Sequence, residues 1–298
     1  MSDTLAGLRR KISTAGDLQS VVRTMKALSA SNIGQYEKSV RALDDYYRTV
    51  ELGLGACFRE SGPAAVVARR KEQADAAVIG VIVFGSDQGL VGRFNEASAD
   101  YALKAIAAMP GKPRVWAVGE RVHTRLADAG LPPGKLFAVP NSVKAIAPLV
   151  GQLLVETEGA HGQSELSELH LFFNGPSAGG GYAAGGQRLL PLDEDWRRAL
   201  AESPWPTANP PEVMGGAATL RAFLRGYLFV SLFRACTESL ASENASRLAA
   251  MQRADKNIDE LLEKLNRAFH SLRQSGIDEE LFDVTAGFEA LGGSRRRP

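Results

Sequence analysis

Residues 258–291 read IDELLEKLNRAFHSLRQSGIDEELFDVTAGFEAL. Apolar side chains recur in this stretch mostly at alternating intervals of three and four residues, which is the spacing of a helix that packs along one seam against another helix. These positions are Ile258, Leu261, Leu265, Ala268 and Leu272, followed by Ile277, Leu281, Val284, Phe288 and Leu291. A long helix with such a stripe needs a partner to cover it.

The distribution of proline marks off two helical arms, one at each end of the chain. Thirteen of the 14 prolines lie between Pro63 and Pro211, and the other is Pro298. Proline has no amide donor and clashes with the preceding turn, so a long uninterrupted helix excludes it. The N-terminal arm carries the same heptad-like spacing at Ile33, Tyr36, Val40, Leu43, Tyr47, Val50, Leu54 and Cys57. We therefore predict a long antiparallel coiled coil of the N- and C-terminal helices.

The middle of the chain alternates between strand and helix patterns. Predicted strands are Val78–Phe84, Arg114–Val118, Lys135–Val139, Glu168–Asn174 and Gln187–Leu192, and predicted helices are Arg93–Met109, Glu120–Ala129 and Ser142–Glu158. Short strands that alternate with helices indicate right-handed crossovers and a mainly parallel sheet. The fold class is thus α/β, with a Rossmann-like domain inserted between the two helices. The predicted boundaries are 1–60 for the first helix, 75–203 for the α/β domain, 212–291 for the second helix and 292–298 for a flexible tail.

Composition excludes several classes of protein. The 298 residues carry a net charge of +1, which argues against a nucleic-acid-binding function. The longest apolar candidate for a membrane span, Phe223–Cys236, is interrupted by Arg225 and Arg234, so we predict a soluble or peripheral protein. Cys57 and Cys236 lack the spacing of a metal or redox site, and we expect both to be buried free thiols.

Two motifs are candidates for a catalytic site. The loop Gly85–Gly92 (GSDQGLVG) lies between a predicted strand and helix, where glycines can cradle phosphate, but its spacing is neither a dinucleotide fingerprint nor a P-loop. A tight turn with Ser86 or Asp87 as a local cap is the favoured interpretation. An α/β enzyme with its site at this loop is the alternative, and it predicts turnover that depends on Asp87.

The second motif, Gly175–Gly179 (GPSAG), matches the G-x-S-x-G pattern of a nucleophile elbow. An elbow must lead directly into a helix. Here the chain continues with glycine, tyrosine and alanine residues, which predicts a loop between strands. The histidines are scattered and no group of carboxylates has metal-ligand spacing, so the sequence predicts no catalytic residue, no cofactor and no metal.

Four segments point to a known family. They are Leu8–Ile12 (LRRKI), Val22–Ser31 (VRTMKALSAS), the loop Gly85–Gly92 and, most specifically, Glu238–Met251 (ESLASENASRLAAM). In this order, over the full length of the chain, they resemble the gamma subunit of the rotary F-type ATP synthase. The resemblance implies a non-catalytic central shaft inside a hexamer of alpha and beta subunits, present in one copy per complex. It also implies contact with the epsilon subunit and the membrane c-ring. The chain would then be a peripheral membrane protein on the cytoplasmic face of a bacterial inner membrane.

The resemblance also assigns roles to individual residues. It implies that Arg23, Met25, Lys26, Arg247, Arg273 and Gln274 contact the beta subunits. It places Val284, Phe288 and Leu291 at an apolar shaft tip. Four positions depart from the family's usual residues: Lys26 replaces an acidic residue, Asn32 a lysine, Val91 a cysteine and Asp278 a threonine. The altered charges at Lys26, Asn32 and Asp278 suggest a divergent or alternative F-type complex.

A third hypothesis is a coiled-coil scaffold unrelated to ATPases. Such a scaffold would form stable dimers through its helical arms. A shaft would instead be a poorly stable or aggregating monomer, because its exposed seams and tip would be covered only inside a surrounding ring of subunits.

Overall fold

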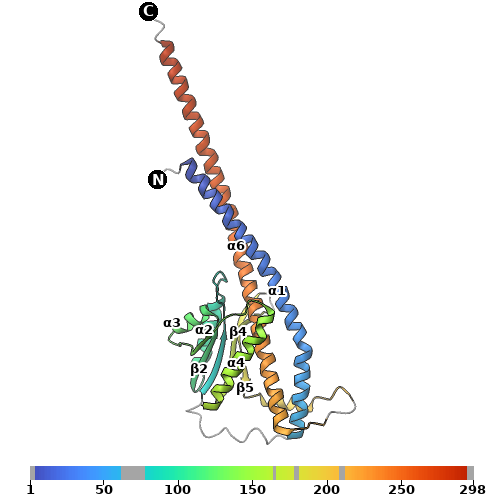
Figure 1. The fold of residues 1–298 in the computed structure, drawn as a ribbon. Helices are drawn as coiled ribbons and strands as arrows, with labels where there is room; N and C mark the ends of the chain where they lie inside the picture. Colours follow the sequence, from blue (N-terminus) through green and yellow to red (C-terminus); the bar gives the residue numbers. More distant parts are fainter. Residues whose placement is uncertain (1–3, 62–77, 164–165, 178–180, 208–211, 294–298) are drawn as a thin grey trace, which may run out of the picture. The chain divides into compact units, whose positions relative to one another are not determined.

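The two ends of the chain form the longest helices of the structure (Figure 1). The computed structural model describes residues 4–61, 78–163, 166–177, 181–207 and 212–293. In chain order the elements are α1 (Leu5–Ser61), β1 (Val78–Phe84), α2 (Phe94–Ala107), β2 (Lys112–Val118), α3 (Glu120–Asp128), β3 (Lys135–Phe137), α4 (Val143–Gln163), β4 (Leu166–Pro176), β5 (Tyr182–Leu190), α5 (Glu194–Glu202) and α6 (Gly216–Gly293). The predicted fold class is therefore confirmed, with two long terminal helices and an α/β domain inserted between them.

One unit of the chain consists of residues 1–28 and 248–298, and its two helical segments run antiparallel. Lys26 of α1 contacts Asp255 of α6, and Arg9 lies with its guanidinium carbon 5.4 Å from the centre of the Phe269 ring. Residue numbers therefore fall along α1 as they rise along α6. Arginine over an aromatic face and apolar side chains along the seam are both typical of such helix pairs.

Within this unit α6 extends beyond the start of α1 (Figure 1). Several of its large apolar side chains are exposed, among them Leu281, Phe282 and Val284. Phe288 and Leu291 also belong to α6, but their side chains lie outside the described residues. The C-terminal part of α6 therefore has an apolar surface that is exposed and that α1 does not cover.

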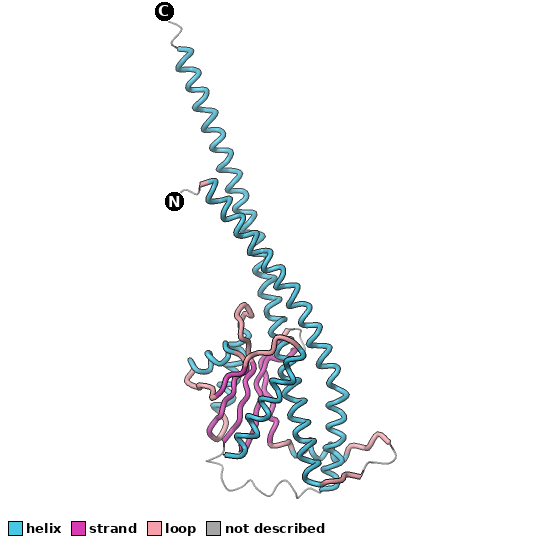
Figure 2. The backbone as a smooth tube through the Cα atoms, viewed as in Figure 1, coloured by secondary structure: helices cyan, strands magenta, loops and turns pink. Residues whose placement is uncertain are grey.

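The second unit, residues 29–247, contains one five-stranded sheet in the order β3-β2-β1-β4-β5. Strands β1 to β4 are parallel, and β5 pairs antiparallel with β4. Figure 2 shows the strands side by side with helices around them. The predicted mainly parallel sheet is therefore confirmed.

The central strand β1 is buried on both faces, as its continuous apolar sequence VIGVIVF predicts. Ile79, Val81 and Val83 pack with residues of α2 and α3. Ile82 and Phe84 belong to the opposite cluster, which contains residues of α4 and α6. Alternate side chains of a strand point to opposite faces. The sheet is thus covered on both sides, on one of them partly by α6.

Two elements differ from the prediction. Strand β5 begins at Tyr182, so the stretch Tyr182–Gly186, predicted as a loop, is part of the sheet. Its glycines have low strand propensity, but a Cβ on Gly186 would lie 2.6 Å from the Phe172 ring, so packing requires glycine there. Helix α5 was not predicted at all. It is short, and Asp193 caps it by accepting a hydrogen bond of 2.9 Å from the backbone N–H of Trp196.

Helices α1 and α6 also pack against each other in the second unit. A Cβ on Gly53 of α1 would lie 2.2 Å from the Phe223 ring of α6, so the small residue allows the close approach. Leu54 and Cys57 are buried in the same cluster as Tyr227 of α6. Both cysteines of the chain are free and buried, as predicted.

Candidate functional site

The glycine loop lies at the carboxyl end of β1, where the strand order of the sheet reverses. The chain runs from β1 to β2 and β3 on one side and returns to β4 on the other. In open α/β sheets, the crevice at this switch point is where ligands bind. The side chains at this switch point therefore bear on whether the glycine loop could be an enzyme's binding site.

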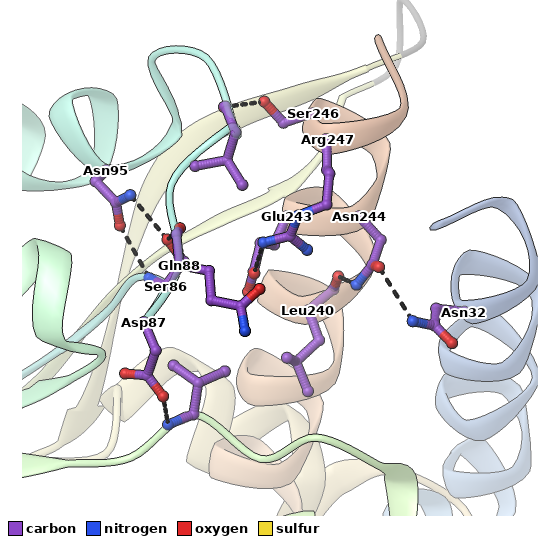
Figure 3. A network of polar contacts seen from close by, with 12 residues as sticks. Asn32, Ser86, Asp87, Gln88, Asn95, Leu240, Glu243, Asn244, Ser246 and Arg247 are labelled. Carbon is purple, nitrogen blue, oxygen red and sulfur yellow. Dashed lines mark hydrogen bonds and ion pairs between the residues drawn. The ribbon is translucent and has the colours of Figure 1, made fainter. Parts of the chain in front are cut away.

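Asp87, in the middle of the loop, acts as a cap for a different helix from the one expected. One carboxylate oxygen accepts a hydrogen bond of 2.9 Å from the backbone N–H of Glu120 at the start of α3. The other accepts one of 2.8 Å from the backbone N–H of Val139 (Figure 3). The expectation that Asp87 caps its own turn was wrong. A carboxylate at a helix N-terminus satisfies a free amide and complements the helix dipole.

Ser86, the other expected cap, makes its hydrogen bonds with residues close to it in sequence. Its hydroxyl donates to the carbonyl of Gln88 at 2.8 Å, and its backbone N–H donates to Asn95 Oδ1 at 2.9 Å. Helix α2 itself begins without a side-chain cap at its N-cap residue, Arg93. The loop is thus held by side-chain to backbone hydrogen bonds, and both oxygens of its carboxylate are engaged by backbone amides.

Gly119 makes room for this arrangement. Its φ is +115°, and a Cβ there would lie 2.8 Å from the backbone nitrogen of Ser86. A residue with a side chain would be strained and would push the loop away. Because the N-cap of α3 is a glycine, the capping oxygen comes from Asp87 instead.

The segment Glu238–Arg247 of α6 packs against the glycine loop; we call this contact the loop–helix junction (Figure 3). The Ser246 hydroxyl donates to the carbonyl of Val91 and lies 3.1 Å from the Tyr182 hydroxyl. At the end of β4, a Cβ on Gly175 would lie 3.5 Å from the Glu238 carboxylate. Helix α6 therefore contacts the loops or ends of β1 and β4, the two strands that flank the switch point.

Glu243 and Arg247 form a buried ion pair at the junction. Arg247 Nη2 lies 2.6 Å from Glu243 Oε1, and the two side chains are only 12% and 8% exposed. Burial raises the pKa of Glu243 by penalising its charged form, and the positive charge of Arg247 opposes this rise. The two charges compensate each other where α6 packs against the glycine loop.

The raised pKa of Glu243 predicts a pH dependence of stability. The folded protein keeps the Glu243 proton to a higher pH than the unfolded chain, where the pKa of glutamate is about 4.3. Glu243 therefore makes its full contribution to the free energy of unfolding below its pKa in the unfolded chain. This contribution is lost as the pH rises through its pKa in the folded protein. We expect wild type, relative to Glu243→Gln, to be more stable at about pH 4.5 than at about pH 7. Urea unfolding of both proteins at the two pH values measures this, and a difference that grows with pH would contradict it.

A neutral contact joins α1 to the junction. Asn32 donates from Nδ2 to Asn244 Oδ1 at 3.3 Å, and Asn244 donates to the carbonyl of Leu240 at 2.8 Å (Figure 3). Asn32 is one of the positions that depart from the family pattern. Its neutral amide fits a buried amide partner, which a lysine would not do without burying a charge.

The G-x-S-x-G motif does not form a nucleophile elbow. After Pro176 the backbone N–H of Ser177 donates to the carbonyl of Gly181 at 3.1 Å, and the chain returns in β5. The motif therefore lies between two strands, β4 and β5, as predicted, whereas an elbow would lead directly into a helix.

The described residues contain neither a metal-binding cluster nor a membrane-spanning helix. Among them, no group of three or more histidine, cysteine, aspartate or glutamate side chains is placed to hold a metal ion. No helix within the described ranges combines the length and apolar character of a membrane span.

The expected beta-subunit contacts lie in different environments. Arg23, Arg273 and Gln274 are exposed, Met25 and Lys26 are half-buried, and Arg247 belongs to the junction. Arg23 and Lys26 both contact Asp255 of α6, with Arg23 Nε 3.3 Å and Lys26 Nζ 2.6 Å from its oxygens.

Sequence reasoning missed Asp255, Glu243 and Ser246. The four-residue spacing of Glu243 and Arg247 on one helix was the one signal that could have revealed a pair.

The fold and the junction define a class of protein: an α/β domain carried between two paired terminal helices, with one of these helices packed at the carboxyl ends of β1 and β4. A family model described as ATP synthase matches residues 4–291. The chain therefore belongs to this ATP synthase family.

Its relatives bear gamma-chain names. The ATP synthase gamma chain of Parafrankia sp. is 28% identical, covering 98% of this chain and 99% of that protein. The gamma chain of Salinispora arenicola is 26% identical, covering 96% of each. Among solved structures, a chain of the Euglena gracilis mitochondrial ATP synthase (OSCP/F1/c-ring) matches with a TM-score of 0.68 at 15% identity, over 99% of this chain and 96% of that one. At that identity the structural match supports the fold.

Proposed function

We propose that this chain is the gamma subunit, the central rotor shaft, of an F-type ATP synthase. The family match across residues 4–291, on a chain whose ends form paired helices, carries this proposal. The partners are the alpha and beta subunits of the catalytic hexamer, the epsilon subunit and the membrane c-ring. One copy serves each hexamer, on the cytoplasmic face of a bacterial inner membrane.

A shaft acts by binding the conformations of the surrounding subunits unequally as it turns. Only such differential binding can shift the equilibria of the catalytic sites. In this proposal Arg23, Met25, Lys26, Arg273 and Gln274 face the beta subunits. Arg247 remains in the predicted set, although only the small exposed part of its side chain is free for such a contact.

The C-terminal part of α6 is the proposed shaft tip. Its exposed Leu281, Phe282 and Val284 give it an apolar surface, and Phe288 and Leu291 continue the sequence pattern. Apolar contact is non-directional, so it imposes less angular preference on a turning shaft than fixed hydrogen bonds would.

The proposed role is non-catalytic, and the loop–helix junction supports this over the enzyme alternative. Both oxygens of the Asp87 carboxylate accept backbone hydrogen bonds, and the helix α6 packs against the loop at the switch point. A polar group already satisfied by backbone amides is poorly placed to act as an acid or base on a substrate.

Co-expression with the alpha and beta subunits from the same source tests the proposal. We expect native mass spectrometry to find one copy of this chain per hexamer, and a bead attached to it to rotate when ATP is added. The hexamer expressed without this chain is the control. An active hexamer that never retains the chain would overturn the proposed function.

A further inference from the structure

Three side chains of α1 converge on a single carboxylate of α6 in the unit formed by residues 1–28 and 248–298. Asp255 accepts hydrogen bonds from Lys26 Nζ at 2.6 Å, Arg23 Nε at 3.3 Å and Gln19 Nε2 at 3.4 Å. Asp259, one turn later, accepts from Gln19 and lies 3.7 Å from Arg23 Nη2. We call these five residues the ion-pair cluster.

The charges within the ion-pair cluster balance one another. Arg23 and Lys26 bring two positive charges, and Asp255 and Asp259 bring two negative ones, so the formal sum is zero. The Asp255 side chain is only 13% exposed, Lys26 is 30% exposed and Arg23 is 59% exposed. The lysine ammonium is thus held against α6, whereas the guanidinium keeps part of its edge toward solvent. Hydrogen bonding from Lys26, followed by its charge and by Arg23, lowers the pKa of Asp255, so Asp255 remains ionised at neutral pH.

We propose that Asp255 is a positioning residue that competes for Arg23 and Lys26 with the acidic loops of the beta subunits, which the family resemblance implies lie near these two side chains. This inference rests on the proposed function. By holding Lys26 and the Nε side of Arg23, Asp255 limits how strongly the shaft binds carboxylates at any one angle. A shaft with weaker angular preferences leaves each angle faster, because the rate of escape depends on the depth of each bound state.

The replacement Asp255→Asn tests this in the complete complex with alpha and beta subunits. It keeps the size of the side chain but removes the carboxylate that pairs with Lys26, and it leaves Arg23 with Asp259 as its counter-ion. We expect ATP hydrolysis at low ionic strength to slow by about twofold to fivefold, the effect of one surface ion pair. At about 0.5 M salt the rate should return toward wild type, because the Debye length is then only a few ångströms and the interaction between exposed charges is largely screened. The second-site change Lys26→Met should also restore most of the lost rate at low salt.

Glu260→Gln is the matched control. It removes one exposed carboxylate from the same stretch of α6, close to Asp255 in sequence. We expect no salt-dependent slowing in this variant. A slowing by Asp255→Asn that is equal at all salt concentrations and is not relieved by Lys26→Met would show a purely structural role and overturn the inference.

Two further outcomes are informative. If Asp255→Asn does not assemble, Asp259→Asn replaces it, since Asp259 is more exposed and, of the two cations in the cluster, contacts Arg23 but not Lys26. Its slowing should be smaller but equally relieved by salt, and a rate equal to that of Glu260→Gln would overturn the inference. Failure of the wild-type chain to join the hexamer would instead overturn the proposed function.

Discussion

Replacing Arg247 with alanine is expected to lower the free energy of unfolding by about 3–5 kcal/mol. The change leaves the carboxylate of Glu243, whose side chain is 8% exposed, without its counter-ion at the loop–helix junction. A buried charge that loses its partner keeps the full cost of removal from water. Urea unfolding of the purified chain, followed by far-UV circular dichroism, measures the loss.

The same helix offers a matched control for this prediction. Arg267 and Glu263 form a pair with the same four-residue spacing, but their side chains are 75% and 73% exposed. We expect Arg267→Ala to change stability by at most about 0.5 kcal/mol. Equal losses in the two variants would show that burial of the Glu243–Arg247 pair does not determine its importance.

Replacing Gly119 with alanine is expected to cost about 2–5 kcal/mol, the sum of backbone strain and overpacking. At a φ of +115° the alanine Cβ would lie within 3 Å of backbone atoms of Gly85 and Ser86. Those atoms cannot move without disturbing the loop that carries Asp87. The loss should appear both in urea unfolding and in faster amide exchange at the start of α3.

Gly151→Ala is the control for that change. Gly151 lies within α4, and a Cβ there would meet no atom within 4 Å. Alanine is the better helix former, so we expect this variant to be more stable by up to about 1 kcal/mol. A destabilised Gly151→Ala, or a neutral Gly119→Ala, would contradict the distinction.

Much of the fold could be predicted because its signals are local. The apolar run Val78–Phe84 coincides with β1, since a strand buried on both faces needs apolar side chains on both. The terminal helices followed from proline exclusion and heptad spacing. By contrast, the start of β5 and the helix α5 were missed. The glycine at position 186 of β5 is explained only by the Phe172 ring that packs against it. Helix α5 is nine residues long, which is shorter than the stretch over which a helical period is recognised.

The candidate site was predictable only in parts. The glycine loop and the segment Glu238–Met251 were both recognised in the sequence, but nothing in either predicts that Ser246 donates to the carbonyl of Val91. Likewise, nothing in the sequence around Arg23 and Lys26 predicts their partner Asp255, because it lies far away along the chain. Charge counted within one segment cannot include a counter-ion that tertiary contact supplies.

The sequence by itself determined most of the helices and strands, that the ends pair, and which family the motifs resemble. These properties follow from backbone sterics and the periodicity of apolar side chains, which act between near neighbours. Only the tertiary structure decided that Asp87 caps α3, that α6 packs against the loop at the switch point, and that Asp255 neutralises Lys26. Each of those contacts joins residues distant in sequence, and their geometry exists only once the chain has folded.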